Sequence, residues 1–160
     1  MKKITIFALV CIICCGSLAG DAGATMREEK PNAVGGELLG RGIVLTLNYE
    51  RYLTGHFGIG AGVMAVGADG GSVFILPLYA SYLSGDKHNL YLSAGVTILG
   101  GGDELSDYET GQFGTFAIGY HFQSDSGFYV RPLFSFLDVI DADDGGSGLV
   151  WPGLCLGGSF

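Results

Sequence analysis

The sequence has few charged residues and no basic excess. Charged side chains make up 15% of its 160 residues, and 8 basic residues against 16 acidic ones give a net charge of −8 at pH 7. This sign is wrong for a phosphate backbone, so we exclude nucleic acid as a partner. The composition also excludes a disordered chain, because 48% of the residues are apolar.

Long apolar runs, prolines and cysteines that could form disulfides are scarce as well. No run of 18 apolar residues follows residue 24, which excludes a transmembrane helix from the rest of the chain. The 4 prolines, and 29 glycines without a three-residue period, exclude collagen. Three of the 4 cysteines lie in the first 24 residues, so Cys155 would remain alone and no disulfide framework is expected.

The first 24 residues have the pattern of a secretory signal peptide. Lys2 and Lys3 precede an apolar run from Ile4 to Cys15, and Ala22-Gly23-Ala24 fits a small-x-small cleavage site. A lipoprotein signal is the alternative, but no cysteine follows the Leu-small-small pattern that lipidation requires. We therefore expect a signal peptide over residues 1–24.

Segments rich in β-branched and aromatic residues recur along the remaining chain, each ended by a Gly/Asp/Ser break. Short breaks alternate with longer, glycine-rich ones, which is typical of an up-and-down outer-membrane barrel. The pattern predicts an all-β fold, an eight-stranded antiparallel up-and-down transmembrane β-barrel over 33–160, after a short periplasmic tail over 25–32. Gly40-Arg41 is either a tight turn at the external end or a bulge within one long strand over 33–53. The strands are expected at 33–39, 42–53, 57–66, 73–83, 89–99, 111–122, 128–139 and 149–160.

Tyrosines collect beside the short breaks. Aromatic rings prefer the bilayer interface, so these tyrosines predict a girdle of aromatic side chains at the periplasmic end of the barrel. An aromatic core of an ordinary β protein is the alternative interpretation. Six of the 8 tyrosines lie within four residues of a short break: Tyr49, Tyr52, Tyr82, Tyr91, Tyr120 and Tyr129.

Alternate residues of a strand face opposite sides. In 89–99 one face is Leu90, Leu92, Ala94, Val96 and Ile98, whereas the other is small and polar. A narrow eight-stranded barrel needs such a small inner face, so the larger apolar face is expected to meet lipid. A soluble, lipocalin-like periplasmic barrel that binds a ligand is the alternative, and it requires the reverse arrangement.

Three ionisable side chains fall on the inward face of their predicted strands. Arg131 in the hydrocarbon would cost roughly 2–4 kcal/mol at the midplane, so it must point inward and needs an acidic partner. Glu50 and His121 lie at a similar height from the short breaks. The sequence predicts that Glu50 pairs with Arg131, with His121 nearby, in a network that closes the lumen.

The chain ends in Leu154-Cys155-Leu156-Gly157-Gly158-Ser159-Phe160. Leu154, Leu156 and the terminal Phe160 resemble the C-terminal assembly signal of bacterial outer-membrane proteins, although Gly158 replaces the aromatic that this signal usually has two residues before its end. The chain resembles the small outer-membrane barrels of OmpX and OmpA-domain type. The segments GELLGRGIVLTLNYERYL, LPLYASYLSGDKHNLYLSAGV and WPGLCLGGSF also resemble small barrels of Bacteroidetes-type bacteria.

The resemblance implies a location in the cell outer membrane and recognition by the barrel-assembly machinery during biogenesis. It implies outer-membrane lipid and lipopolysaccharide as the surrounding partners, a monomer, no cofactor and no assigned activity. A structural or surface-interaction role without an open pore is therefore expected.

A lipid-modifying enzyme of the lipid A deacylase type is the alternative function. Such an enzyme needs a His-x-Ser pair on one strand face, and none of the 3 histidines has it. No G-x-S-x-G motif occurs either. We therefore expect no catalytic site.

The acidic clusters at 103–109 and 138–144 match no calcium loop, so no metal site is predicted, although bridging of divalent cations to lipopolysaccharide stays open.

Overall fold

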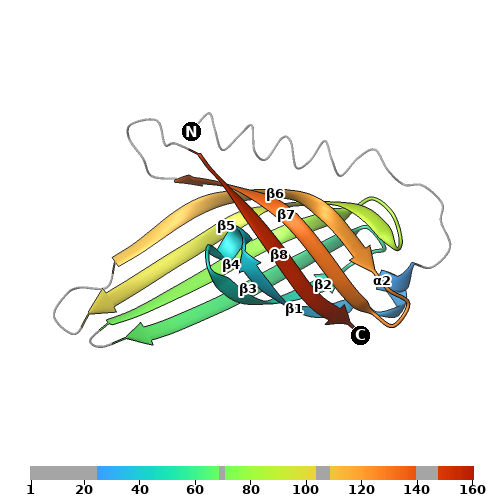
Figure 1. Ribbon diagram of the computed structural model, residues 1–160, viewed down its shortest axis with the longest axis horizontal. Coiled ribbons are helices and arrows are strands. Elements are labelled where there is room, and N and C mark those ends of the chain that lie inside the picture. The colour runs from blue at the N-terminus through green and yellow to red at the C-terminus, as the bar shows by residue number, and fades with distance from the viewer. Residues whose placement is uncertain (1–24, 69–70, 104–108, 140–147) are drawn as a thin grey trace.

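A computed structural model describes residues 25–68, 71–103, 109–139 and 148–160, which form a closed antiparallel barrel of eight strands in sequential order (Figure 1). The barrel closes where β1 pairs with β8. The predicted all-β fold and strand number are therefore confirmed. The elements are α2 (Met26–Glu29), β1 (Asn32–Leu39), η1 (Gly40–Gly42), β2 (Leu45–Tyr52), β3 (Phe57–Ala68), β4 (Gly71–Leu83), β5 (His88–Asp103), β6 (Glu109–Gln123), β7 (Phe128–Val139) and β8 (Leu149–Ser159).

The first two strands are separate, so the alternative of one bulged strand over 33–53 is wrong. They are joined by the 3₁₀ turn η1, and β2 begins at Leu45 rather than at residue 42 as predicted. Leu39 and Ile43 flank this turn with φ of 59° and 67°, which bulky residues rarely adopt. The sequence predicted a tight turn at the external end of the barrel and did not predict its direction. In the structure η1 folds inward, so that Arg41 is buried in the lumen.

The outer wall is apolar between two polar rims. Register and strand alternation place most of the large exposed aliphatic and aromatic side chains outside, as the sequence predicted. Polar outward residues of the described strands lie near the strand ends, such as Arg51 and His88 at one end and Ser72 and Asp138 at the other. The outward apolar residues include Val34, Leu47, Ile59, Leu78, Leu90, Ile118, Phe134 and Leu156. This is the reverse of the polar exterior that a soluble lipocalin-like barrel requires.

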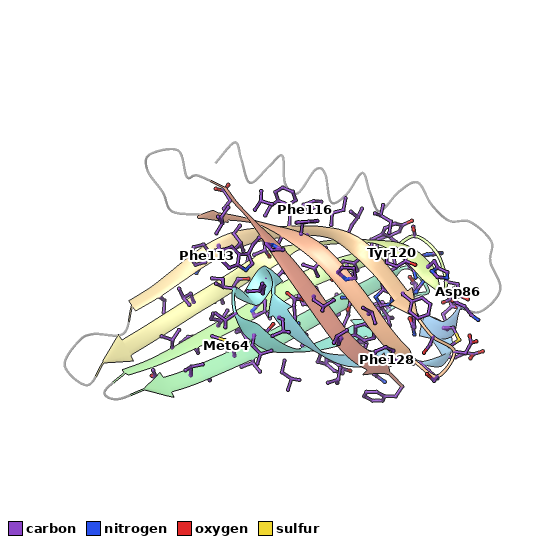
Figure 2. All side chains as sticks on the ribbon, in the orientation of Figure 1. Met64, Asp86, Phe113, Phe116, Tyr120 and Phe128 are labelled. Carbon is purple, nitrogen blue, oxygen red and sulfur yellow. The ribbon has the colours of Figure 1, made fainter. Side chains whose placement is uncertain are left out.

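The predicted tyrosine girdle is half wrong. Tyr49, Tyr82 and Tyr120 do face outward near the short turns, and Figure 2 shows Tyr120 and Phe128 toward the end of the barrel that carries α2. Tyr52, Tyr91 and Tyr129 are instead buried in the lumen. The reason is strand alternation, since each of them lies on the inward face of its strand.

The two ends of the barrel differ. The α2 end carries α2 and the three short connections, and the opposite end, here called the loop end, carries the tall strands β3 to β6 beyond η1 (Figure 1).

Residues 25–32, expected as a tail, contain the one-turn helix α2 and begin β1. None of the helices in the described part of the chain has the length and hydropathy of a membrane-spanning helix. The expected signal peptide, residues 104–108 of one acidic cluster and residues 140–144 of the other lie outside the described residues.

Candidate functional site

The lumen is where the described chain concentrates its buried polar groups. Glycines make room for the large inward rings of the lumen: a Cβ on Gly60 would run into the Tyr79 ring, and one on Gly35 or Gly157 would run into the Tyr129 hydroxyl. The glycine-rich composition thus has a steric reason, because the inward rings lie over neighbouring strands, where only glycine leaves room for them.

Glu50, Arg131 and His121 meet in this lumen. Arg131 Nη2 donates to Glu50 Oε2 at 2.9 Å, and Arg131 Nε donates to His121 Nδ1 at 3.0 Å. The other oxygen of Glu50 accepts a short hydrogen bond from Ser81. All these side chains are buried. Because His121 Nδ1 accepts from a guanidinium, its ring proton lies on Nε2, which is 3.4 Å from Gln123 Oε1.

A second buried ion pair lies on the loop side of the first. Arg41 Nη2 is 2.5 Å from Glu37 Oε2, and Arg41 Nη1 donates to the Tyr91 hydroxyl at 3.0 Å. The Arg41 guanidinium lies 3.6 Å from the centroid of the Tyr79 ring, in cation–π geometry. The turn η1 is held in place by two further bonds, from Thr97 Oγ1 to the Arg41 carbonyl and from Trp151 Nε1 to the Ile43 carbonyl.

Arg27 closes the lumen at the α2 end. Its guanidinium is fully buried and donates to the carbonyls of Gly55 and Asp86 at 2.5 and 3.0 Å, and to the Gly85 carbonyl. Burial lowers the pKa of Arg27, and the nearby Asp86 and Glu50 carboxylates oppose that shift. The helix α2 therefore acts as an end cap whose cation is satisfied mainly by backbone oxygens.

Arginines and tyrosines alternate along the lumen. Arg27 lies 5.9 Å from the Tyr52 centroid, the Tyr52 hydroxyl is 3.4 Å from Arg131 Nη2, and Arg131 lies 3.9 Å from the Tyr91 centroid. The Tyr91 hydroxyl then accepts from Arg41, which stacks on Tyr79. We call this set the lumen column: Arg27, Tyr52, Arg131, Tyr91, Arg41 and Tyr79. Buried side chains thus fill the lumen from α2 to η1.

Sequence reasoning identified only one of the two ion pairs. A charged side chain within a strand avoids lipid, and this rule placed Arg131 inward. Applied to Glu37 on β1, the same rule would have placed the Glu37 side chain in the lumen. Arg41 was assigned to an external turn, and only the inward fold of η1 brings it to Glu37. Arg27 had no signal, because it lies outside every strand and its partners are mainly backbone carbonyls.

The three histidines of the chain have backbone or side-chain partners in the described structure. The imidazole of His56 contacts the Leu83 carbonyl, that of His88 the Tyr120 hydroxyl, and that of His121 Gln123 and Arg131. Among these residues no imidazole is hydrogen-bonded to a serine or threonine hydroxyl. Nor does this part of the chain hold a group of three potential metal-ligating side chains. Cys155 is buried against Tyr129.

The predicted assembly signal lies at the α2 end of β8. Leu154 and Leu156 face outward and are exposed, and Phe160 is the most exposed of the three. The Phe160 backbone N–H and C=O bond the Asn32 backbone, which helps to close the barrel between β1 and β8. Two aliphatic side chains of this segment therefore belong to the outer wall, and the terminal ring lies at its rim.

Comparison with solved structures identifies the same fold elsewhere. The chain is similar to the N-terminal β-barrel domain of Pseudomonas aeruginosa OprF, with 11% identity, a TM-score of 0.57, and coverage of 79% of this chain and 94% of that one. The attachment invasion locus protein Ail of Yersinia pestis matches with 12% identity and a TM-score of 0.41, over 80% of this chain and 91% of Ail. Ail in complex with the heparin analogue sucrose octasulfate matches with 13% identity and a TM-score of 0.41, over 80% and 92%.

The similarity to the OprF domain shows a shared eight-stranded barrel fold. No protein-family model matches the chain, and no curated protein sequence matches it.

Proposed function

We propose that this chain is a non-enzymatic barrel of the bacterial outer membrane with a closed lumen and a structural or cell-surface interaction role. The observation that carries the proposal is the combination of an apolar outer wall with a lumen filled by the lumen column. Soluble proteins rarely expose such a continuous apolar surface, whereas a bilayer requires one.

Several features support the membrane location. The shared fold with the OprF barrel domain, the signal-peptide pattern and the terminal Phe160 all point to the outer membrane. There the outer wall contacts acyl chains and lipopolysaccharide, the barrel-assembly machinery inserts the chain, and the monomer needs no cofactor. The hydrogen bonds of the three histidines favour this role over a lipid A deacylase.

Membrane fractionation combined with heat-modifiable gel mobility tests this proposal. The native protein should sediment with outer membranes, and after detergent extraction the unheated form should migrate apart from the boiled form. Recovery in the soluble periplasmic fraction would refute the location, because the lipocalin-like alternative predicts that result.

A further inference from the structure

The barrel wall is unequal in height. Strands β1 and β2 have 8 residues each, whereas β5 has 16. At a rise of about 3.4 Å per residue and a tilt of about 40°, the short strands span about 20 Å along the barrel axis and β5 about 40 Å. The apolar band of an outer-membrane barrel is about 25 Å tall. Above the β1–β2 hairpin the wall therefore ends slightly below the top of the hydrocarbon.

This gap in the wall, here called the notch, is flanked by β3 and β8. The β2–β3 pairing ends at Val63, so residues 64–68 of β3 have no β2 partner. The β1–β8 pairing ends at Gly153, so residues 149–152 of β8 have no β1 partner. Because the shortfall is small, these free edges lie at the boundary of hydrocarbon and headgroups, where water and headgroups can satisfy them.

Directly above η1, the inward positions of β5 and β6 up to Gly101 and Gly111 carry no charged side chain, unlike the polar lumen below. Strand register places six side chains on this inner face, here called the cup: Met64, Val66, Val73, Leu99, Phe113 and Leu149. Val66 and Leu149, on the two strands that flank the notch, are 54% and 50% exposed, and Val73 is 43% exposed. Inward-facing aliphatic side chains with this much exposure lack a covering surface within the described chain.

The rim of the notch is apolar too. Leu38, Leu39, Val44 and Leu45 at the end of the β1–β2 hairpin are all exposed. They join the outer wall below to the cup above without an intervening charge. The floor is η1, held by the bonds to Thr97 and Trp151 described above. Figure 1 shows η1 part-way along the barrel, with β3 to β6 continuing past it.

We propose that the acyl chain of a bilayer lipid enters through the notch and lies in the cup. This inference rests on the proposed membrane location. An acyl chain is favoured over water because it covers the exposed Val66, Val73 and Leu149 side chains, each of which is more stable against hydrocarbon. It is favoured over a protein partner because the cup is continuous with the lipid-facing wall. The bound chain is a ligand and not a substrate, since the three histidines all lie toward the α2 end.

The single tryptophan of the chain makes the proposal measurable. Trp151 lies on the inward face of β8 at the junction of floor and cup. The protein is refolded into phosphatidylcholine vesicles whose acyl chains are brominated, and its fluorescence is compared with that in unbrominated vesicles. Bromine quenches an indole only at short range, so an acyl chain in the cup quenches Trp151.

Two control proteins calibrate this signal. Tyr79→Trp with Trp151→Phe places the indole on an inward position below η1, and it reports quenching through the wall. Tyr79 suits this use because its hydroxyl has no hydrogen-bond partner among the described residues. Leu47→Trp with Trp151→Phe places the indole on the outer wall, and it reports insertion into the bilayer.

We expect brominated lipid to quench Trp151 at least twice as strongly as the Tyr79→Trp indole. Val73→Glu should lower Trp151 quenching to the level of that control, because a carboxylate in the cup excludes an acyl chain, and Val66→Gln should do the same if Val73→Glu fails to fold. Equal quenching of Trp151 and the Tyr79→Trp indole would overturn the proposal. Quenching of Trp151 by iodide in the buffer but not by brominated lipid would also overturn it, since the cup would then hold water. An unquenched Leu47→Trp indole would instead show that the barrel is outside the bilayer, and the proposed function itself would fail.

Discussion

Arg131 and Glu50 lie 81 residues apart in the chain, on β7 and β2, and their side chains meet at 2.9 Å inside the barrel. Neither strand neighbours the other in the sheet, so the pair crosses the lumen. Each partner has further polar contacts, Arg131 with His121 and Glu50 with Ser81. The pair therefore links two distant parts of the wall.

Breaking this pair should destabilise the barrel more than removing it. Arg131→Met leaves Glu50 as an uncompensated buried charge and should lower the free energy of unfolding by roughly 3–5 kcal/mol. The double variant Arg131→Met with Glu50→Gln should lose less. Reversible urea unfolding in lipid vesicles measures both. If the double variant is the less stable of the two, the charge-pairing explanation is wrong.

The Tyr91 hydroxyl should matter where the Tyr79 hydroxyl does not. Tyr91→Phe removes the acceptor of the Arg41 Nη1 bond at 3.0 Å and should cost about 1–3 kcal/mol, because it leaves a buried donor unsatisfied. Tyr79→Phe is the matched control, since its hydroxyl has no partner among the described residues and its ring remains against Arg41. Its unfolding free energy should stay within about 0.5 kcal/mol of the original. Equal losses in the two variants would contradict the geometry of the lumen column.

Removal of the Arg27 side chain should loosen the α2 end. Arg27→Ala deletes three bonds to the carbonyls of Gly55, Gly85 and Asp86. Amide hydrogen exchange should then accelerate in the turns after β2 and β4, while the β5–β6 pairing keeps its protection. Arg51→Ala, at an exposed arginine near the same end, serves as the control and should leave exchange unchanged. Uniform acceleration across all strands would indicate global destabilisation instead of loss of a cap.

The terminal ring should be needed for assembly. Deletion of Phe160 should reduce the amount of folded barrel in the outer membrane and raise degradation in the periplasm, whereas Phe160→Tyr should assemble normally. Heat-modifiable mobility in whole-cell extracts measures the folded fraction. Normal assembly of the deletion would remove the basis for regarding Leu154, Leu156 and Phe160 as an assembly signal.

The two ends of the barrel should face opposite sides of the membrane. In a Cys155→Ser background, an impermeant maleimide added to intact cells should label Ser72→Cys at the loop end but not Asp86→Cys at the α2 end. Permeabilised cells provide the control, because both positions are exposed and both should then react. Labelling of the Asp86→Cys protein alone in intact cells would invert the orientation.

Strand alternation made much of the wall predictable from the sequence. Its period of two places Leu90 and Val96 outside and Arg131 and Tyr91 inside, and it also places Tyr52 inside, whereas the predicted girdle treated both tyrosines as interface residues. Proximity of tyrosines to the short turns was the weaker signal. Nearness along the chain fixes height in the barrel but not the side of the wall that a ring faces.

The loop-end architecture was less predictable. The sequence shows Gly40-Arg41 as a connection, but its inward fold depends on contacts with Glu37, Thr97 and Trp151 from distant strands. The left-handed backbone of Leu39 and Ile43 contradicts local preference and persists only within that packing. For the same reason neither the second ion pair nor the cup could be predicted from local patterns.

Planar-bilayer conductance tests the central claim most directly, namely that this is a membrane-inserted barrel closed by its own side chains. Refolded protein should insert and give no steady single-channel current, because the lumen column fills the lumen between α2 and η1. The double variant Arg41→Ala with Arg131→Ala removes two guanidinium groups from the lumen column. It should give measurable current steps. Steady open channels from the unmodified protein, with inserted barrels verified by heat-modifiable mobility, would contradict the account.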